Sequence, residues 1–216
     1  MHRTAVRVAT SSACGEPPQW GRLVSRAAVC TMYLLFAYAH IASLERDGFR
    51  LSVALLGLFE TVMVVLVFAR RPTDEVDRSP LAVVAGLAGS FAALGLRPVA
   101  GGNELMVGEI VQVAGVLVQL GASLSLGRSF GLVPANRGVK TGGLYRWVRH
   151  PFYLAYLVNQ LGYVASNPSA ANGLVLLVGL GFQVVRIRYE ERLLGRDPAY
   201  ASYAGGVRWH LVPGVW

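Results

Sequence analysis

The fold of this protein is decided by residues 143–191, which read GLYRWVRHPFYLAYLVNQLGYVASNPSAANGLVLLVGLGFQVVRIRYEE. Two apolar runs, 152–165 and 171–185, are separated by Asn167 and Pro168, and the stretch between residues 152 and 185 contains no Asp, Glu, Lys or Arg. Charged side chains crowd both ends. Two helices that turn at Asn167-Pro168 would form a hairpin and return both charged ends to one membrane face. We therefore predict a polar pocket at that face.

The composition indicates a membrane protein. Of the 216 residues 54% are hydrophobic and only 15% are charged, far from the balance of an ordinary globular domain. A membrane core of about 30 Å requires roughly 20 helical residues. Four runs approach that length: 27–44, 51–69, 80–96 and 105–126. The two later runs, of 14 and 15 residues, are short. The predicted class is all-α, a multi-pass transmembrane helical bundle of about four full spans plus a C-terminal helical hairpin.

The basic residues predict the orientation. The net charge is +8, and loops rich in Lys and Arg stay in the cytoplasm. With six segments and a cytoplasmic N-terminus, only Arg46, Arg50 and Arg97 of the 20 basic residues fall outside. Both termini and the polar pocket are then cytoplasmic. The charge is a topology signal, and nucleic-acid binding is not expected because no soluble basic domain is present.

The chain divides into three predicted parts: residues 1–22 as a flexible cytoplasmic tail, 23–126 as N-terminal transmembrane helices, and 127–216 as the C-terminal region that carries the chemistry. The two cysteines, Cys14 and Cys30, indicate neither a disulfide framework nor a metal site. Near the C-terminus, Tyr200, Tyr203 and two tryptophans fit an interfacial tail at the lipid headgroups.

Two acidic residues lie inside predicted spans. Glu60 is central in the run 51–69, and an ionisable group there is costly enough to suggest function. The alternative is a protonated Glu60 that is hydrogen-bonded to a neighbouring helix and has only a structural role. Glu109 shares one helical face with Gln112 and Gln119. That face is expected to look inward.

Three motifs in order make the C-terminal region recognisable. TGGLYRWVRHPFY at 141–153 is followed by RIRYEE at 186–191 and YASY at 200–203. This combination resembles the isoprenylcysteine carboxyl methyltransferase family, and related phospholipid methyltransferases share the Arg-His-Pro-x-Tyr and Glu-Glu elements. The resemblance covers roughly residues 127–213.

The resemblance implies an integral membrane enzyme that binds S-adenosylmethionine in a cytoplasm-facing pocket and methylates a lipidic acceptor, with a carboxylate as the first choice. No metal is implied. The residues it places around the cofactor are Lys140, Tyr145, His150, Pro151, Phe152, Tyr153 and Glu190. Arg186 and Glu190 are the implied catalytic residues, with Arg186 holding the substrate carboxylate.

The residues themselves leave simpler interpretations open. Arg186 and Glu190 are one helical turn apart, so they could form only a surface salt bridge worth a few tenths of a kcal/mol. The His150 ring could cap backbone groups at the start of a helix whose first turn contains Pro151.

Two other classes of protein also remain open. One is a membrane NAD(P)H-dependent sterol-type reductase, whose His-Pro-x-Tyr element is similar. The other is a non-enzymatic scaffold or transporter, suggested by Glu60 and Glu109. An amine or a thiol acceptor would also be compatible with a methyltransferase. The sequence does not predict the oligomeric state. Heavy use of Ala, Gly, Val and Arg with a single Lys suggests a GC-rich genome and hence a bacterium, which would place the protein in the inner membrane.

Overall fold

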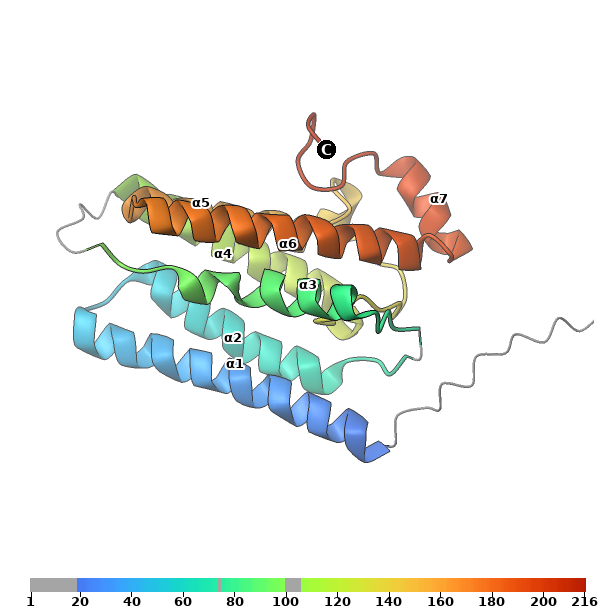
Figure 1. Cartoon of the computed structure of the whole chain (residues 1–216), viewed down its shortest axis with the longest axis horizontal. Helices are drawn as coiled ribbons and strands as arrows, with labels where there is room; N and C mark the ends of the chain where they lie inside the picture. Colours follow the sequence, from blue (N-terminus) through green and yellow to red (C-terminus); the bar gives the residue numbers. More distant parts are fainter. Residues whose placement is uncertain (1–18, 74, 100–105) are drawn as a thin grey trace, which may run out of the picture.

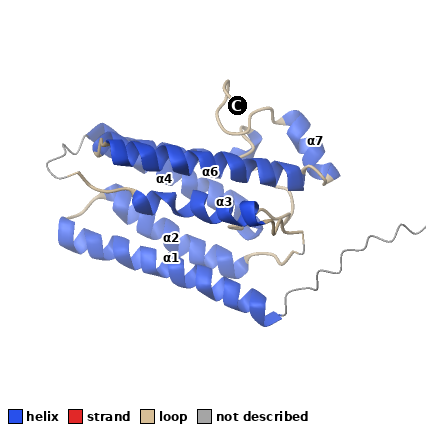
Figure 2. Ribbon diagram, in the orientation of Figure 1, coloured by secondary structure: helices blue, strands red, loops and turns tan. Residues whose placement is uncertain are grey.

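The computed structural model describes residues 19–73, 75–99 and 106–216, and these residues form a bundle of helices (Figure 1). No strand occurs in these ranges (Figure 2); their one β-bridge joins Val76 and Ala135. The predicted all-α class is confirmed. Most of the predicted tail, including Cys14, lies outside the described residues, and the first helix already begins at Gln19.

Seven α-helices are described, and four of them are long and apolar enough to cross a membrane: α1, α2, α4 and α6. Their bounds are α1 Gln19–Asp47, α2 Leu51–Ala69, α3 Pro80–Phe91, α4 Met106–Leu126, α5 Pro151–Ser166, α6 Ala170–Leu194 and α7 Pro198–Gly206.

The number of full spans agrees with the prediction, but their identity does not. The run 80–96 is too short as a helix, because α3 has 12 residues and gives way to a 3₁₀ turn, Ala92–Gly95. In contrast, α6 continues without a break through the charged residues after Val185 and reaches 25 residues. Its apolar run and its polar end are one helix of about 37 Å.

The predicted turn at Asn167 is confirmed, since α5 ends at Ser166 and α6 begins at Ala170. The two helices do not pack mainly on each other. α5 lies along α4, α6 lies along α3, and α1 and α2 lie side by side (Figure 1). The hairpin is therefore built into the bundle, and the end of α6 is held close to the start of α5.

Three segments gather at one end of the bundle. The loop before α3 is bonded to the loop after α4, through Asp77 N–H to the Pro134 carbonyl (3.0 Å) and Asn136 N–H to the Glu75 carbonyl (2.9 Å). The C-terminal segment pairs with the start of α5 through His150 N–H and the His210 carbonyl (2.9 Å). These contacts surround the end of α6.

Candidate functional site

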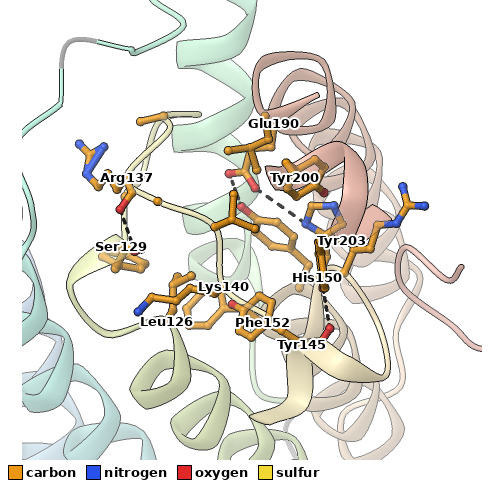
Figure 3. A pocket seen from close by; sticks show the side chains of 18 of the residues that line it. Leu126, Ser129, Arg137, Lys140, Tyr145, His150, Phe152, Glu190, Tyr200 and Tyr203 are labelled. Carbon is orange, nitrogen blue, oxygen red and sulfur yellow. Dashed lines mark hydrogen bonds and ion pairs between the residues drawn. The ribbon is translucent and has the colours of Figure 1, made fainter. Parts of the chain in front are cut away.

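A cavity lies between the end of α6, the start of α5, α7 and the loop after α4 (Figure 3). It encloses about 760 Å³ of empty space, part of it open to solvent. Seven of the eight residues predicted for the site line it: Lys140, Tyr145, His150, Phe152, Tyr153, Arg186 and Glu190. Pro151 does not line the cavity; it is buried in the first turn of α5.

His150 is the residue immediately before α5, but its ring makes no capping hydrogen bond. Its Nε2 is instead 2.8 Å from Oε1 of Glu191. A carboxylate is a stronger partner for an imidazole than a neutral backbone group. The interpretation of His150 as a capping side chain is therefore wrong, while Pro151 occupies the first helical turn as expected.

Glu190 faces the cavity with one oxygen satisfied and the other open. The Tyr153 hydroxyl donates to Oε1 over 2.6 Å, and Arg186 Nε lies 3.4 Å from the same oxygen. Oε2 lies 3.9 Å from His150 Nδ1, which is beyond hydrogen-bond distance. Glu190 can therefore accept a hydrogen bond from a ligand without losing its internal contacts.

Arg186 is deeply buried, with only 2% of the residue exposed. Its Nη1 donates to Ser90 Oγ (2.8 Å) and to the Gly86 carbonyl (3.4 Å), and Nη2 donates to the Gly131 carbonyl (2.9 Å). The guanidinium also stacks 4.9 Å from the centre of the Tyr153 ring. A surface salt bridge is therefore the wrong description of Arg186 and Glu190.

The contacts of Arg186 use four of its five N–H groups. Within the described part of the chain, the second N–H of Nη2 has no acceptor. Arg186 is thus fixed in place by three other segments and retains one donor.

Glu191 has a structural role that the sequence analysis did not assign. It accepts hydrogen bonds from Arg149 Nη1 (3.0 Å), from the His150 ring and from the Tyr200 hydroxyl. Arg149 also donates to the carbonyls of Ala204 and Val207. One carboxylate therefore joins α6 to the start of α5 and to α7. The sequence signal for this role was the presence of an Arg-His pair in one motif and a Glu-Glu pair in another, because these side chains can bind one another.

Tyr200 and Tyr203 also line the cavity, a role that their assignment to an interfacial tail did not include. The Tyr203 hydroxyl donates to the Tyr145 carbonyl. Burial raises the pKa of Tyr203 to about 12. Burial also raises the pKa of Tyr145 and of Tyr200 well above the usual value, and at Tyr200 the hydrogen bond to Glu191 adds to this effect. All three hydroxyls are neutral near pH 7.

The acidic residues of the spans lie away from this cavity. Glu109 accepts from Arg50 Nη2 (3.0 Å) and from the backbone and hydroxyl of Ser52 (both 2.8 Å), so it fastens α4 to the start of α2. Glu60 lines a second cavity, and its Oε1 lies 3.9 Å from His40 Nδ1. Gln112 and Gln119 are buried and line this second cavity, as their inward face predicted.

Comparison with known proteins agrees with the motifs. Residues 104–196 match the model of the "Isoprenylcysteine carboxyl methyltransferase (ICMT) family". The chain is also 33% identical over 109 residues to Protein-S-isoprenylcysteine O-methyltransferase A of Arabidopsis thaliana, a match that covers 46% of this chain and only 55% of that relative. The resemblance predicted from the sequence is confirmed, and residues 104–196, which hold most of the cavity, carry the pattern of the isoprenylcysteine carboxyl methyltransferase family.

Proposed function

We propose that this protein is an integral membrane methyltransferase that uses S-adenosylmethionine and transfers its methyl group to a carboxylate of a lipidic acceptor. The observation that carries the proposal is the cavity itself. Within the matched segment, it brings together a carboxylate with an open oxygen, Glu190, and a buried guanidinium with one remaining donor, Arg186.

The residues present fit the cofactor. S-adenosylmethionine has an ammonium, a carboxylate and a cationic sulfur, and it supplies a methyl group activated by that sulfur. The open oxygen of Glu190 suits the ammonium, and Lys140 suits the carboxylate. Aromatic rings attract cations, and Tyr145, Phe152 and Tyr153 line the same cavity.

The protein's own contribution is alignment. Arg186 can give one hydrogen bond to an acceptor carboxylate, which orients the acceptor without a two-point grip. A tighter grip would stabilise the bound acceptor as much as the transition state, and only a difference between the two increases the rate. Phe152 and Phe130 line the cavity, and Phe152 also packs against Phe59. This apolar inner wall would help to keep water away from the acceptor.

No general base is required for a carboxylate acceptor, because that group is ionised near neutral pH. This agrees with the position of His150, whose Nε2 is committed to Glu191. His150 then serves as a wall of the cavity and as a support for Glu191. An amine or thiol acceptor would instead require a group that takes a proton.

Calorimetry on the purified full chain tests the cofactor. We expect S-adenosylmethionine to bind, and Glu190→Ala to weaken binding by about tenfold or more through loss of a charged hydrogen bond. Glu45→Ala is the matched control, since Glu45 is exposed on α1. Binding of NADPH without binding of S-adenosylmethionine would replace this proposal with the sterol-type reductase.

The acceptor is tested by methyl transfer to an S-prenylated cysteine, compared with the same compound whose carboxylate is converted to an amide. We expect product only from the free carboxylate. Equal transfer to an amine-headed lipid would contradict the carboxylate assignment and leave the methyltransferase assignment intact.

A further inference from the structure

A separate cavity of about 1260 Å³, partly open to solvent, is lined by arginines. It lies between the start of α1, the loop from α2 to α3, and residues 132–137. Its arginines are Arg26, Arg70, Arg71, Arg78 and Arg137. None of the described residues that line it is acidic, and none of these five guanidiniums is paired with a carboxylate in the described ranges. We refer to it as the arginine cavity.

Arg137 distinguishes this cavity from an ordinary basic membrane surface. Its Nε and Nη1 are buried and have no hydrogen-bond partner among the residues that the structure describes. Burial, together with the positive charges of Arg70 and Arg26, lowers the pKa of Arg137 to about 10. The positive-inside rule explains arginines in contact with water and headgroups, but not a guanidinium with buried, unpaired donors. The missing partner must be an acceptor, and the surrounding charge favours an anion.

The direction of Arg137 separates the arginine cavity from the cofactor site. Arg137 lines both cavities, but Figure 3 shows its guanidinium pointing away from Glu190 and His150. Arg70, Arg71 and Arg78 line the arginine cavity and not the first one. An anion held by these four side chains would therefore lie beside the cofactor site, outside it.

The other wall of the arginine cavity is apolar and comes from α1, a candidate membrane span, and from the shorter apolar helix α3. Val29 of α1 and Leu87 of α3 line it, and Leu87 is 44% exposed. Exposed Val84 lies about one helical turn before Leu87 on α3 and so is on nearly the same face. A ligand that suits both walls has an anionic head and a hydrocarbon tail that lies in the bilayer.

We propose that the arginine cavity binds the phosphate group of an anionic lipid. Guanidinium groups match phosphate oxygens with pairs of parallel hydrogen bonds, so Arg137 would give its unpaired Nε–H and Nη1–H to the phosphate. Arg70, Arg71 and Arg78 add charge around it, and the tail lies against α1 and α3. The site is distinct from the methyl-transfer site and does not depend on that activity.

Calorimetry on the full chain in a neutral detergent tests the site with three probes: a short-chain phosphatidic acid, phosphatidylcholine with the same chains, and inorganic phosphate. We expect phosphatidic acid to bind more tightly than the other two, and added salt to weaken it. The double variant Arg71→Gln/Arg78→Gln removes two exposed arginines that line only this cavity. It should weaken binding by about tenfold or more.

The control is Arg97→Gln, an exposed arginine far from the arginine cavity, which should bind phosphatidic acid like the parent protein. Arg137→Gln should weaken binding as the double variant does, and a melting curve shows whether it folds; if it does not, the double variant decides.

Three results would overturn the proposal. Phosphatidic acid binding that survives the double variant shows that the arginines are not the site. If phosphatidylcholine binds as tightly as phosphatidic acid, the site does not select ligands for net negative charge. If inorganic phosphate binds as tightly as phosphatidic acid, the site binds a free anion and the lipid part of the proposal is wrong. S-adenosylmethionine binding, measured on the same double variant, should be unchanged, so loss of the proposed function and loss of this site are distinguishable.

Discussion

Adjacent carboxylates with different surroundings define the site at the scale of single residues. Neighbouring helical positions point about 100° apart, so Glu190 and Glu191 face different partners. Both oxygens of Glu191 accept hydrogen bonds, and the donors are Arg149, His150 and Tyr200. Glu190 keeps an open oxygen toward the cavity. The first supports the architecture and the second is available for a ligand.

Glu191→Ala should therefore destabilise the protein more than Glu190→Ala. Hydrogen bonds to charged groups are worth about 1.5 to 3 kcal/mol each. Glu191 is partly exposed and its partners can regain water, so we expect a loss of only about 2 kcal/mol in the free energy of unfolding. Thermal unfolding followed by circular dichroism measures this, with Glu45→Ala as the exposed control. A larger loss for Glu190→Ala would contradict these assignments.

Arg186→Lys should separate binding of the acceptor from binding of the cofactor. Lysine has three donors on one nitrogen and cannot reach Ser90, Gly86 and Gly131 while also facing the cavity. We expect kcat/KM for the acceptor to fall about a hundredfold, since misplacement by about 1 Å has that effect. The Kd of S-adenosylmethionine should remain within about threefold.

The matched control for this change is Arg188→Lys, because Arg188 is exposed on the same helix. Its kinetics should equal those of the parent protein. Equal losses at both positions would show that Arg186 acts only through the stability of α6.

The sequence predicted which motif residues lie together wherever their spacing along one segment determines their neighbours. Glu190 and Arg186 share a helical face, and the hairpin brings His150 and Tyr153 to them. Contacts across the fold were not predictable in this way. The role of Tyr200 depends on where α7 lies, and burial of Arg186 depends on Gly86 and Gly131 coming close to α6.

At the scale of helices, the site depends on close contact between α4 and α5. A Cβ on Gly115 would lie 2.5 Å from the backbone nitrogen of Asn159, and one on Gly162 would lie 2.6 Å from the backbone nitrogen of Gln112. Small residues let helix backbones approach in a membrane. Because α5 begins at Pro151, directly after His150, this contact sets one wall of the cavity.

Gly115→Ala should force α4 and α5 apart, since a backbone atom cannot move aside as a flexible side chain can. Overpacking of this kind costs about 1 to 3 kcal/mol. Gly181→Ala in α6 is the control, because a Cβ there meets nothing within 4 Å. It should leave the melting temperature unchanged or raise it slightly, as alanine favours helix. Equal melting temperatures for both variants would show that α4 and α5 can separate without loss.

Helix lengths show a limit of sequence-based prediction at this scale. A count of apolar residues ended the last predicted span at Val185. The helix continues because residues 186–194 contain neither Gly nor Pro. The same count extended the third span to residue 96, past the 3₁₀ turn where α3 stops. Hydropathy measures how much of a segment suits lipid, whereas hydrogen bonding decides where the helix ends.

Charge distribution organises the molecule as a whole. One end of the bundle carries the start of α1, the end of α2, the loop after α4 and α7 (Figure 1). Residues of these segments line the cavity around Glu190 and the arginine cavity. The loop between α1 and α2 lies at the other end, with Arg46 bound to Asp47 and Arg50 bound to Glu109. From the positive-inside rule, we predict that the end with the cavities faces the cytoplasm.

Cysteine labelling tests this orientation in a Cys14→Ser/Cys30→Ser background. Phe49 lies between α1 and α2 and is 77% exposed, and Ser202 is exposed on α7. A membrane-impermeant maleimide should label Phe49→Cys in intact cells and Ser202→Cys only after the membrane is opened. The reverse pattern would place the cavity on the outer face. S-adenosylmethionine is made in the cytoplasm, so that result would contradict the proposed function as well as the orientation.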